Sequence, residues 1–212
     1  MKVRYLGHAC FEITSKEGIK VITDPYTKVG YELPEGLTAD ILTVSHGHFD
    51  HNFTQGIEAR YLVNEAKAYS LDGIEVYGVS AFHDPENGAL RGKNIIYIMQ
   101  IDGLSLCHMG DIGEECSETL AEKIGKVDVL FVPVGGTYTV DAVGAKKYID
   151  KLQPKVVIPM HYKPKDGSLD IAPIHTFLDL YASNDIQCIK DGILEINEQT
   201  RGIFYLERAK TI

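Results

Sequence analysis

Four residues with metal-binding side chains lie within six positions of the chain, between His46 and His51. They directly follow an apolar run, 39–44, that is typical of a buried strand. In an extended or turn-like backbone, His46 and His48 point the same way because they are two positions apart. We expect these two to bind one metal ion, and Asp50 and His51 to turn toward a second. Zinc and similar ions accept imidazole nitrogen and carboxylate oxygen, and catalytic zinc sites keep one position open for water.

Three further candidate ligands each follow an apolar run later in the chain, namely His83, Asp111 and His161. Because each closes a strand-like run, we expect them to meet at one edge of a sheet, beside the histidine-rich segment. A surface turn rich in histidine would need no such partners, and a structural zinc site is filled by four ligands, mostly Cys or His. Seven candidates, two of them carboxylates, therefore favour a catalytic metal centre.

Another histidine, His108, lies three residues before Asp111 and competes with His83 for the first metal site. If the strand that begins at Leu104 continues to Asp111, alternation places Asp111 on one face and His108 on the other. A liganding His108 would then require a backbone break, which Gly110 permits but does not demand. We therefore predict His83 as the ligand. We expect His108 to be buried, hydrogen-bonded to the backbone and able to steady the metal loops.

The first half of the chain is predicted to be a β-meander. Asp-Gly pairs at 72–73 and 102–103 each separate two apolar runs and predict hairpins. A third pair at 191–192 repeats the pattern and predicts a final hairpin that ends at 203–206. Other apolar runs that predict strands are 2–6, 10–14, 19–23, 40–45, 127–134 and 155–160.

Helical patterns appear in the second half of the chain. Ser117 is a candidate N-cap for the run 118–124, which is followed by Gly125 as a stop signal. The segments 141–152 and 172–182 predict two more helices. Strands and helices in this order predict a single α/β domain over the whole chain, residues 1–212, with helices packed on one large mixed sheet or on two. The polar loops 24–38 and 82–92 are expected to cover the site.

Composition excludes several classes of protein. The chain has 30 acidic and 21 basic residues and a formal net charge of −9, and an acidic surface repels phosphate backbones, so we expect no nucleic-acid partner. No apolar run approaches 18 residues, so we expect neither a membrane span nor a signal peptide. The four cysteines form no CxxC pair and are typical of reduced thiols, which indicates a cytoplasmic protein.

The candidate ligands form a pattern that resembles the metallo-β-lactamase superfamily, and the resemblance covers nearly the whole chain. Short motifs similar to the branch that contains ascorbate-6-phosphate lactonase and other short hydrolases stand at 6–9, 23–25, 133–138 and 158–162. The resemblance implies an αβ/βα four-layer sandwich, with two mixed β-sheets, helices outside and the metal ions at one edge. The β-lactamases proper usually have a cysteine where this chain has Asp111, and neither Cys107 nor Cys116 matches that position.

The resemblance also implies a role for each ligand. The first ion is held by His46, His48 and His83, the second by Asp50, His51 and His161, and Asp111 bridges the two. A water or hydroxide between two cations is a nucleophile at neutral pH, because coordination lowers the pKa of water from about 16 toward about 7. Asp50 is expected to relay the leaving-group proton. The nitrogen and oxygen ligands favour zinc, with manganese or iron as alternatives.

Residues beside the ligands are expected to steady them or to contact the substrate. In the related branch a histidine at the position of His8 lies near the metals, so His8 is expected to brace a ligand or to touch the substrate. Asp24 is expected to brace the metal loop by hydrogen bonds. Arg91 and Lys163 are most simply solvated loop charges, and the alternative is that they bind a phosphate or carboxylate of the substrate. Tyr138 is expected to add a hydroxyl.

Together, the residues and the resemblance predict a hydrolase with two divalent ions that cleaves a lactone, ester or phosphodiester bond of a small anionic metabolite. The alternative is a metal-binding protein or sensor on the same fold without hydrolytic activity. All seven ligand types are present, which favours the enzyme, because a sensor needs no bridged pair of ions with open positions. The sequence indicates neither the substrate nor the oligomeric state, since specificity lies in loops that one sequence does not decode.

Overall fold

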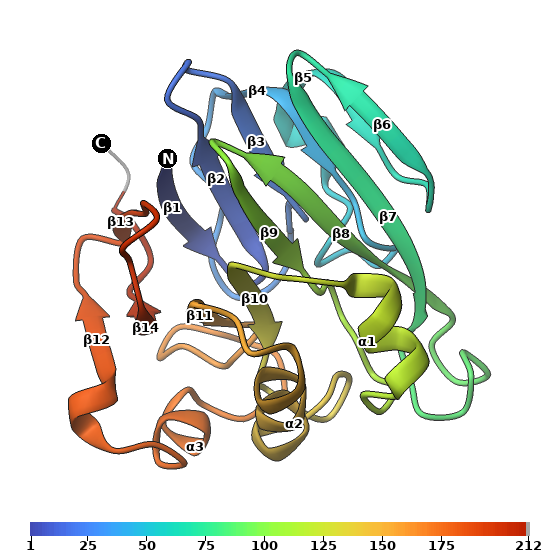
Figure 1. Cartoon of the computed structure of the whole chain (residues 1–212), viewed down its shortest axis with the longest axis vertical. Helices are drawn as coiled ribbons and strands as arrows, with labels where there is room; N and C mark the ends of the chain where they lie inside the picture. The colour runs from blue at the N-terminus through green and yellow to red at the C-terminus, as the bar shows by residue number, and fades with distance from the viewer. Residues whose placement is uncertain (211–212) are drawn as a thin grey trace.

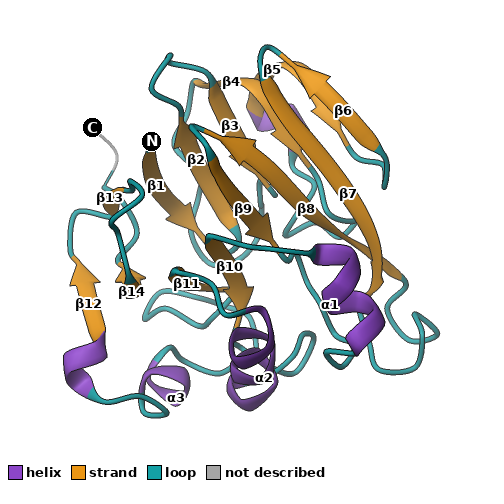
Figure 2. Cartoon of the chain, viewed as in Figure 1, coloured by secondary structure: helices purple, strands orange, loops and turns teal. Residues whose placement is uncertain are grey.

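Two mixed β-sheets pack face to face in the computed structural model, which describes residues 1–210 (Figures 1 and 2). The six-stranded sheet contains, in spatial order, β13 (Ile193–Glu195), β1 (Lys2–Gly7), β2 (Cys10–Thr14), β3 (Lys20–Thr23), β4 (Leu37–Thr43) and β5 (Ile57–Val63). The eight-stranded sheet contains β12 (Ile186–Ile189), β14 (Gly202–Leu206), β11 (Val156–Met160), β10 (Val129–Pro133), β9 (Leu104–His108), β8 (Lys93–Ile101), β7 (Ile74–Phe82) and β6 (Ala68–Leu71). Both sheets combine antiparallel and parallel neighbours.

The meander β6–β9 follows from local turn chemistry. Leu71 pairs with Ile74 and Ile101 pairs with Leu104, so each Asp-Gly pair is a two-residue hairpin loop. Both residues of each pair have positive φ, as the preferred type I′ turn requires. The two predicted hairpins are therefore confirmed.

The helices α1 (Glu118–Ile124), α2 (Ala142–Leu152) and α3 (His175–Leu178) lie along the eight-stranded sheet, as Figure 2 shows. The Ser117 side chain accepts a hydrogen bond from the Leu120 amide, which confirms the predicted N-cap of α1. Tyr148 of α2 is buried against β10 and β11, whose residues are buried at every position. Strands covered on both faces read as continuous apolar runs, and the sequence patterns of β10 and β11 have this form.

A second apolar cluster lies on the other face of the six-stranded sheet. It joins Leu6, Ile22 and Leu42 of the strands to Tyr26 and Val29 of the loop between β3 and β4. The side chains of this loop therefore cover the outer face of the sheet. Their packing holds the loop next to the ends of β1 and β4. None of the helices within residues 1–210 is long and apolar enough to cross a membrane.

The predicted final hairpin is wrong. The strands β12 and β14 are parallel neighbours, and β13, which follows Asp191-Gly192, pairs with β1 in the other sheet. The Tyr5 amide donates to the Gly192 carbonyl over 2.9 Å, so the turn itself is tied to β1. The edge of β1 offers β13 its backbone partners, and the Asp-Gly pair therefore carries the chain from one sheet to the other.

The predicted helix over 172–182 is also wrong in extent, because only His175–Leu178 is helical. The backbone of Ala172 is already used by two loops. Its amide donates to the Gly135 carbonyl, 2.7 Å away, and its carbonyl accepts from the Lys163 amide, 2.9 Å away. Helical hydrogen bonds cannot form there. The edge strand β5 was not predicted, because exposed and half-buried positions alternate along it and weaken its apolar signal.

Candidate metal centre

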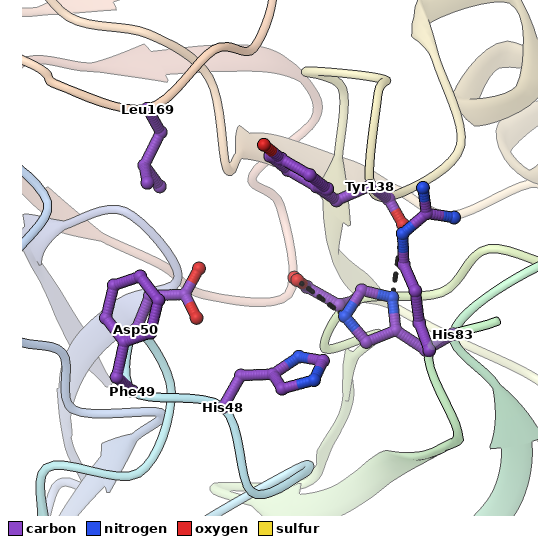
Figure 3. Close-up of a pocket in the computed structure, with 8 residues that line it drawn as sticks. His48, Phe49, Asp50, His83, Tyr138 and Leu169 are labelled. Atoms are coloured by element: carbon purple, nitrogen blue, oxygen red, sulfur yellow. Dashed lines mark hydrogen bonds and ion pairs between the residues drawn. The ribbon is translucent and has the colours of Figure 1, made fainter.

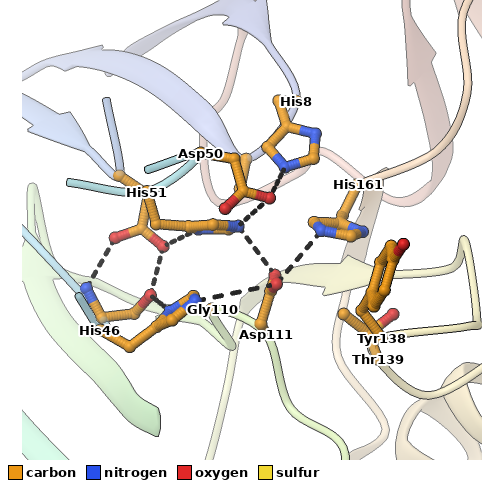
Figure 4. Close-up of polar contacts among 12 residues, drawn as sticks. His8, His46, Asp50, His51, Gly110, Asp111, Tyr138, Thr139 and His161 are labelled. Carbon is orange, nitrogen blue, oxygen red and sulfur yellow. Dashed lines mark hydrogen bonds and ion pairs between the residues drawn. The ribbon is translucent and has the colours of Figure 1, made fainter. Parts of the chain in front are cut away.

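The candidate ligands and Asp24, which braces them, lie in loops that follow the ends of strands. His8 follows β1 and Asp24 follows β3, the segment from Ser45 to His51 follows β4, and His83 follows β7. Asp111 and His161 come after β9 and β11 in the same way. These strand ends meet at one edge of the sandwich, so residues far apart in sequence converge on one cluster (Figure 4).

Three histidines form the first part of the cluster. The ligand atoms of His46, His48 and His83 lie within 4.8 Å of one another. The Nδ1 of His83 donates to the carbonyl of Tyr138 over 3.1 Å, and the Nδ1 of His46 lies 3.0 Å from the Ser45 hydroxyl. Both hydrogen bonds orient the rings so that Nε2 is left for another partner.

The second part contains His8, Asp50, His51 and His161, whose ligand atoms also lie within 4.8 Å of one another. His8 donates through Nε2 to the Asp50 carboxylate at 3.2 Å, and its ring lies against that of His161, with centroids 4.2 Å apart. The Nδ1 of His51 donates to Asp24 over 2.8 Å. His8 therefore contacts the candidate ligand Asp50 directly, and its hydrogen bond can hold the Asp50 carboxylate in place.

The Asp111 carboxylate lies between the two parts. One oxygen is 3.0 Å from the Nε2 of His51, and the other is 3.1 Å from that of His161 and 3.3 Å from that of His83. The Nε2 of His46 is 3.9 Å away. A carboxylate that reaches both histidine groups is placed as a bridge between two ions would be.

Asp111 reaches this place because the strand does not continue to it. The strand β9 ends at His108, and Gly110 has a φ of 53°, so the alternation expected from Leu104 to Asp111 is wrong. The buried side chain of Asn94 holds the resulting loop: its amide donates to the Met109 carbonyl and its oxygen accepts from the Asp111 amide, each over 2.9 Å. Asn94 was missed from the sequence, where its one signal was a polar residue at the start of an apolar strand.

His108 lies in the same region but has both ring nitrogens occupied. Its Nε2 donates to the Ala9 carbonyl over 2.9 Å, and its Nδ1 accepts from the Gly110 amide over 3.3 Å. This is the pattern of a neutral imidazole, and burial also lowers the pKa of His108. Although the alternation argument fails, the structure still directs the His108 ring away from the cluster.

Asp24 connects the loop after β4 to the cluster by hydrogen bonds. Its carboxylate accepts from the Ser45 amide at 2.8 Å, from the Ser45 hydroxyl at 2.5 Å and from His51 at 2.8 Å. The pKa of Asp24 is lowered although burial opposes this, because the hydrogen bonds from His51 and Ser45 favour the charged form. Ser45 was missed from the sequence, since a serine before a histidine carries no distinctive signal.

Burial and neighbouring charges shift the pKa values of the histidines in the cluster in opposite directions. Burial lowers the pKa of His46 to about 3 and, together with neighbouring His161, that of His8 to about 4. Burial opposes a charged His51, but Asp111 and Asp24 raise its pKa well above the usual value. His8 and His46 are thus neutral near pH 7, which is the form that binds metals.

Several buried polar atoms of the cluster form no well-aligned hydrogen bond within residues 1–210, although some of them lie close to one another. They are the Nε2 atoms of His46 and His51, both ring nitrogens of His161 and one Asp111 oxygen. Buried polar atoms in proteins are normally hydrogen-bonded, so a group of such atoms in one cluster indicates that a further group binds there. Nitrogen and carboxylate oxygen are the ligands that divalent ions take, and the residues therefore fit a metal centre.

Residues 2–161 match the family model described as the β-lactamase superfamily domain. The chain belongs to the metallo-β-lactamase superfamily. Within it, the chain is 30% identical to a UPF0173 metal-dependent hydrolase from Thermococcus onnurineus, over 76% of this chain and 84% of that protein. A relative of the same description from Carboxydothermus hydrogenoformans is also 30% identical, with the same coverage.

A crystal structure of a proposed Zn-dependent hydrolase of this superfamily from Thermotoga maritima has a TM-score of 0.80 and 35% sequence identity. The similarity covers 96% of this chain and 97% of that one. The family and fold predicted from the sequence are therefore confirmed. The protein is a metal-dependent hydrolase of the metallo-β-lactamase superfamily with a His/Asp cluster able to bind metal.

A cavity of about 330 Å³ lies beside the candidate ligands (Figure 3). The cavity is lined by His48, Phe49, Asp50, His83, Arg91, Asp111, Tyr138 and Leu169. The Arg91 guanidinium lies 5.7 Å from the centroid of the Tyr138 ring. Lys163, the other cation expected near the site, lines two different cavities, so Arg91 is the one of the pair that faces the cluster.

Proposed function

We propose that the protein is a hydrolase with two divalent metal ions that cleaves a lactone, ester or phosphodiester bond of a small anionic metabolite. The position of Asp111, in reach of both histidine groups, supports this proposal. One ion would be held by His46, His48 and His83 and the other by Asp50, His51 and His161, with Asp111 shared. Zinc is the first candidate, and manganese and iron suit the same nitrogen and oxygen ligands.

The bound ions would supply a Lewis acid for the scissile bond and a water of lowered pKa. The chain's own residues set the geometry around them. Asp24 orients His51 through its Nδ1, and Asn94 holds the backbone of Asp111, so both ligands keep their place as the reaction proceeds. Asp50 lines the cavity and is hydrogen-bonded to His8, which positions its carboxylate to pass a proton to the leaving group.

Arg91 is the residue that we assign to the anionic group of the substrate. It lines the cavity, and its guanidinium lies beside the Tyr138 ring. A planar guanidinium binds carboxylate or phosphate through two parallel hydrogen bonds, which gives both affinity and orientation.

Metal analysis combined with a substrate screen tests the proposal. Protein prepared without chelator should contain about two ions per chain, and should hydrolyse chromogenic esters, lactones or phosphodiesters with added zinc or manganese. Asp111→Ala should lose metal and lower turnover by about three orders of magnitude or more, because it removes a contact to both groups. Asp150→Ala, an exposed carboxylate on α2, is the control and should match the wild type.

An active protein with one ion or none would exclude the dinuclear site. An Asp111→Ala variant with two ions and normal turnover would remove the bridging role. Bound metal without hydrolysis of any of the three bond classes would favour the alternative, a metal-binding sensor on this fold.

A further inference from the structure

The wall of the metal cavity is apolar on two sides. Figure 3 shows Phe49 and Leu169 on one side, with Asp50 beside Phe49, and the Tyr138 ring across from them, with His48 below. Phe49 is 50% exposed and Tyr138 is 38% exposed, so both rings face solvent through the cavity mouth. Single exposed apolar side chains are ordinary on a protein surface. Here they line one concave site together, which is typical of a site for an organic ligand.

The position of Phe49 is tied to the metal loop. It stands between the candidate ligands His48 and Asp50, and its carbonyl accepts a hydrogen bond from the Thr27 amide over 3.1 Å. The backbone of Phe49 is therefore held by the loop that covers the six-stranded sheet.

Tyr138 is tied to the same site from the opposite side. Its carbonyl accepts from the Nδ1 of His83, so the backbone at Tyr138 moves only if that ligand moves. Its ring forms part of the cavity wall, and the Arg91 guanidinium lies over that ring. The backbones that carry both rings are thus hydrogen-bonded to neighbouring segments at the site, so Phe49 and Tyr138 line the cavity from held positions.

We propose that the substrate carries an aromatic or similarly flat apolar group, which binds in the gap bounded by Phe49, Tyr138 and Leu169 beside the scissile bond. This inference rests on the proposed hydrolase function and names its substrate class. A volume of about 330 Å³ is at the small end of ligand pockets, which suits one ring and the bond to be cleaved. A sugar-like substrate would place its hydroxyl groups against Phe49, Tyr138 and Leu169. Of these three side chains, only Tyr138 has a hydrogen-bonding group, so the gap suits a sugar poorly.

Binding of matched acids tests this without turnover. Metal-loaded protein is titrated calorimetrically with 3-phenylpropionate and with propionate, which share a carboxylate and differ in the ring. The wild type should bind 3-phenylpropionate about tenfold or more tighter, because the ring is buried on both faces. Phe49→Ala should weaken the binding of 3-phenylpropionate about fivefold or more, and should change the affinity for propionate less than twofold.

The control is Leu62→Ala, which removes an apolar side chain of the same exposure, 49%, from β5, outside the cavity lining. It should leave both affinities unchanged. Leu169→Ala is the second test variant, since it lies on a different loop, and it should act like Phe49→Ala. Metal content and circular dichroism establish that each variant is folded and loaded.

Equal affinity of the two acids for the wild type would overturn the inference, as would equal losses for both acids in Phe49→Ala. The proposed function fails separately. Hydrolysis of esters or lactones without any preference for a ring removes this inference alone, whereas selective binding of 3-phenylpropionate without hydrolysis removes the proposed function alone.

Discussion

The candidate ligands are oriented by three different kinds of partner. The Nδ1 of His51 faces the Asp24 carboxylate, that of His46 faces the Ser45 hydroxyl, and that of His83 faces the backbone carbonyl of Tyr138. Each partner leaves Nε2 toward the cluster, so the outcome is the same although the chemistry differs. A carboxylate partner also makes an imidazole a stronger base, and we expect His51 to be the firmest of these ligands.

Replacing single histidines should separate ligands from supporting residues. We expect His83→Ala to lose one of two ions and most activity, because its Nε2 faces Asp111 and the other histidines. We expect His108→Ala to keep both ions, since both of its nitrogens are used by backbone groups. Elemental analysis of the two purified variants measures this directly.

The stability of His108→Ala serves as the internal control. Losing a buried histidine should lower the free energy of unfolding by about 1–3 kcal/mol even though metal is retained. A variant His108→Ala that loses an ion, together with a His83→Ala that keeps both, would reverse the assignment.

At the scale of elements, the site depends on loops that approach one another very closely. The loop after β10 passes the loop after β11 at Gly135, where a methyl group would overlap the carbonyl oxygen of His161. Gly135 also accepts the hydrogen bond from Ala172 that prevents the predicted helix. Close packing of these two loops thus affects both the position of a ligand and the point after which α3 can begin.

We predict that Gly135→Ala displaces His161. The added methyl group should lower the free energy of unfolding by about 1–3 kcal/mol and weaken binding of the second ion. Denaturant unfolding and competition with a chelator measure the two effects.

The matched control is Gly47→Ala, which lies between His46 and His48 but has no atom within 4 Å of the added methyl group. It should retain metal binding and lose less than about 1 kcal/mol of stability. If Gly47→Ala were the more damaging change, the site would depend on flexibility of the motif and not on the approach of the two loops.

At the scale of the whole molecule, the His/Asp cluster is a set of mostly buried polar groups at one edge of an otherwise apolar sandwich. His8 and His46 have pKa values lowered by burial to about 4 and about 3, and burial lowers those of His83 and His108 as well. Their neutral state favours metal binding, but it makes the metal-free protein sensitive to acid.

We predict that the metal-free protein loses stability as the pH falls from about 6.5 to about 4. In this range the histidines of the unfolded chain take up protons, whereas His8 and His46 of the folded chain do not, so protons favour unfolding. Each such histidine costs up to about 1.4 kcal/mol per pH unit. His51 has a raised pKa and stays charged throughout the range, so it does not offset the loss.

Thermal unfolding of chelator-treated protein at several pH values measures this effect. His175→Ala, an exposed histidine on α3, should leave the slope unchanged. Stability that is flat between pH 6.5 and 4 would show that the buried histidines are not neutral in the folded state.

The ligand types, the two hairpins of the meander and the N-cap of α1 followed from the sequence alone. Each depends on residues within a few positions of one another, such as Asp72 beside Gly73 or Ser117 three residues before Leu120. Local geometry determines them whatever the rest of the chain does. The apolar runs that end at His83, Asp111 and His161 indicated these residues as further ligands, and the family resemblance assigned a role to each.

The tertiary structure decided which local preferences were used. Asp191-Gly192 has the residues of a hairpin but joins two sheets, because the edge of β1 offers β13 its partners. Asn94 holds Asp111 across 17 positions, and Phe49 faces Tyr138 across one cavity. Such contacts are made between segments distant in sequence, whose side chains carry no pattern until the two sheets pack and bring their strand ends to the same edge.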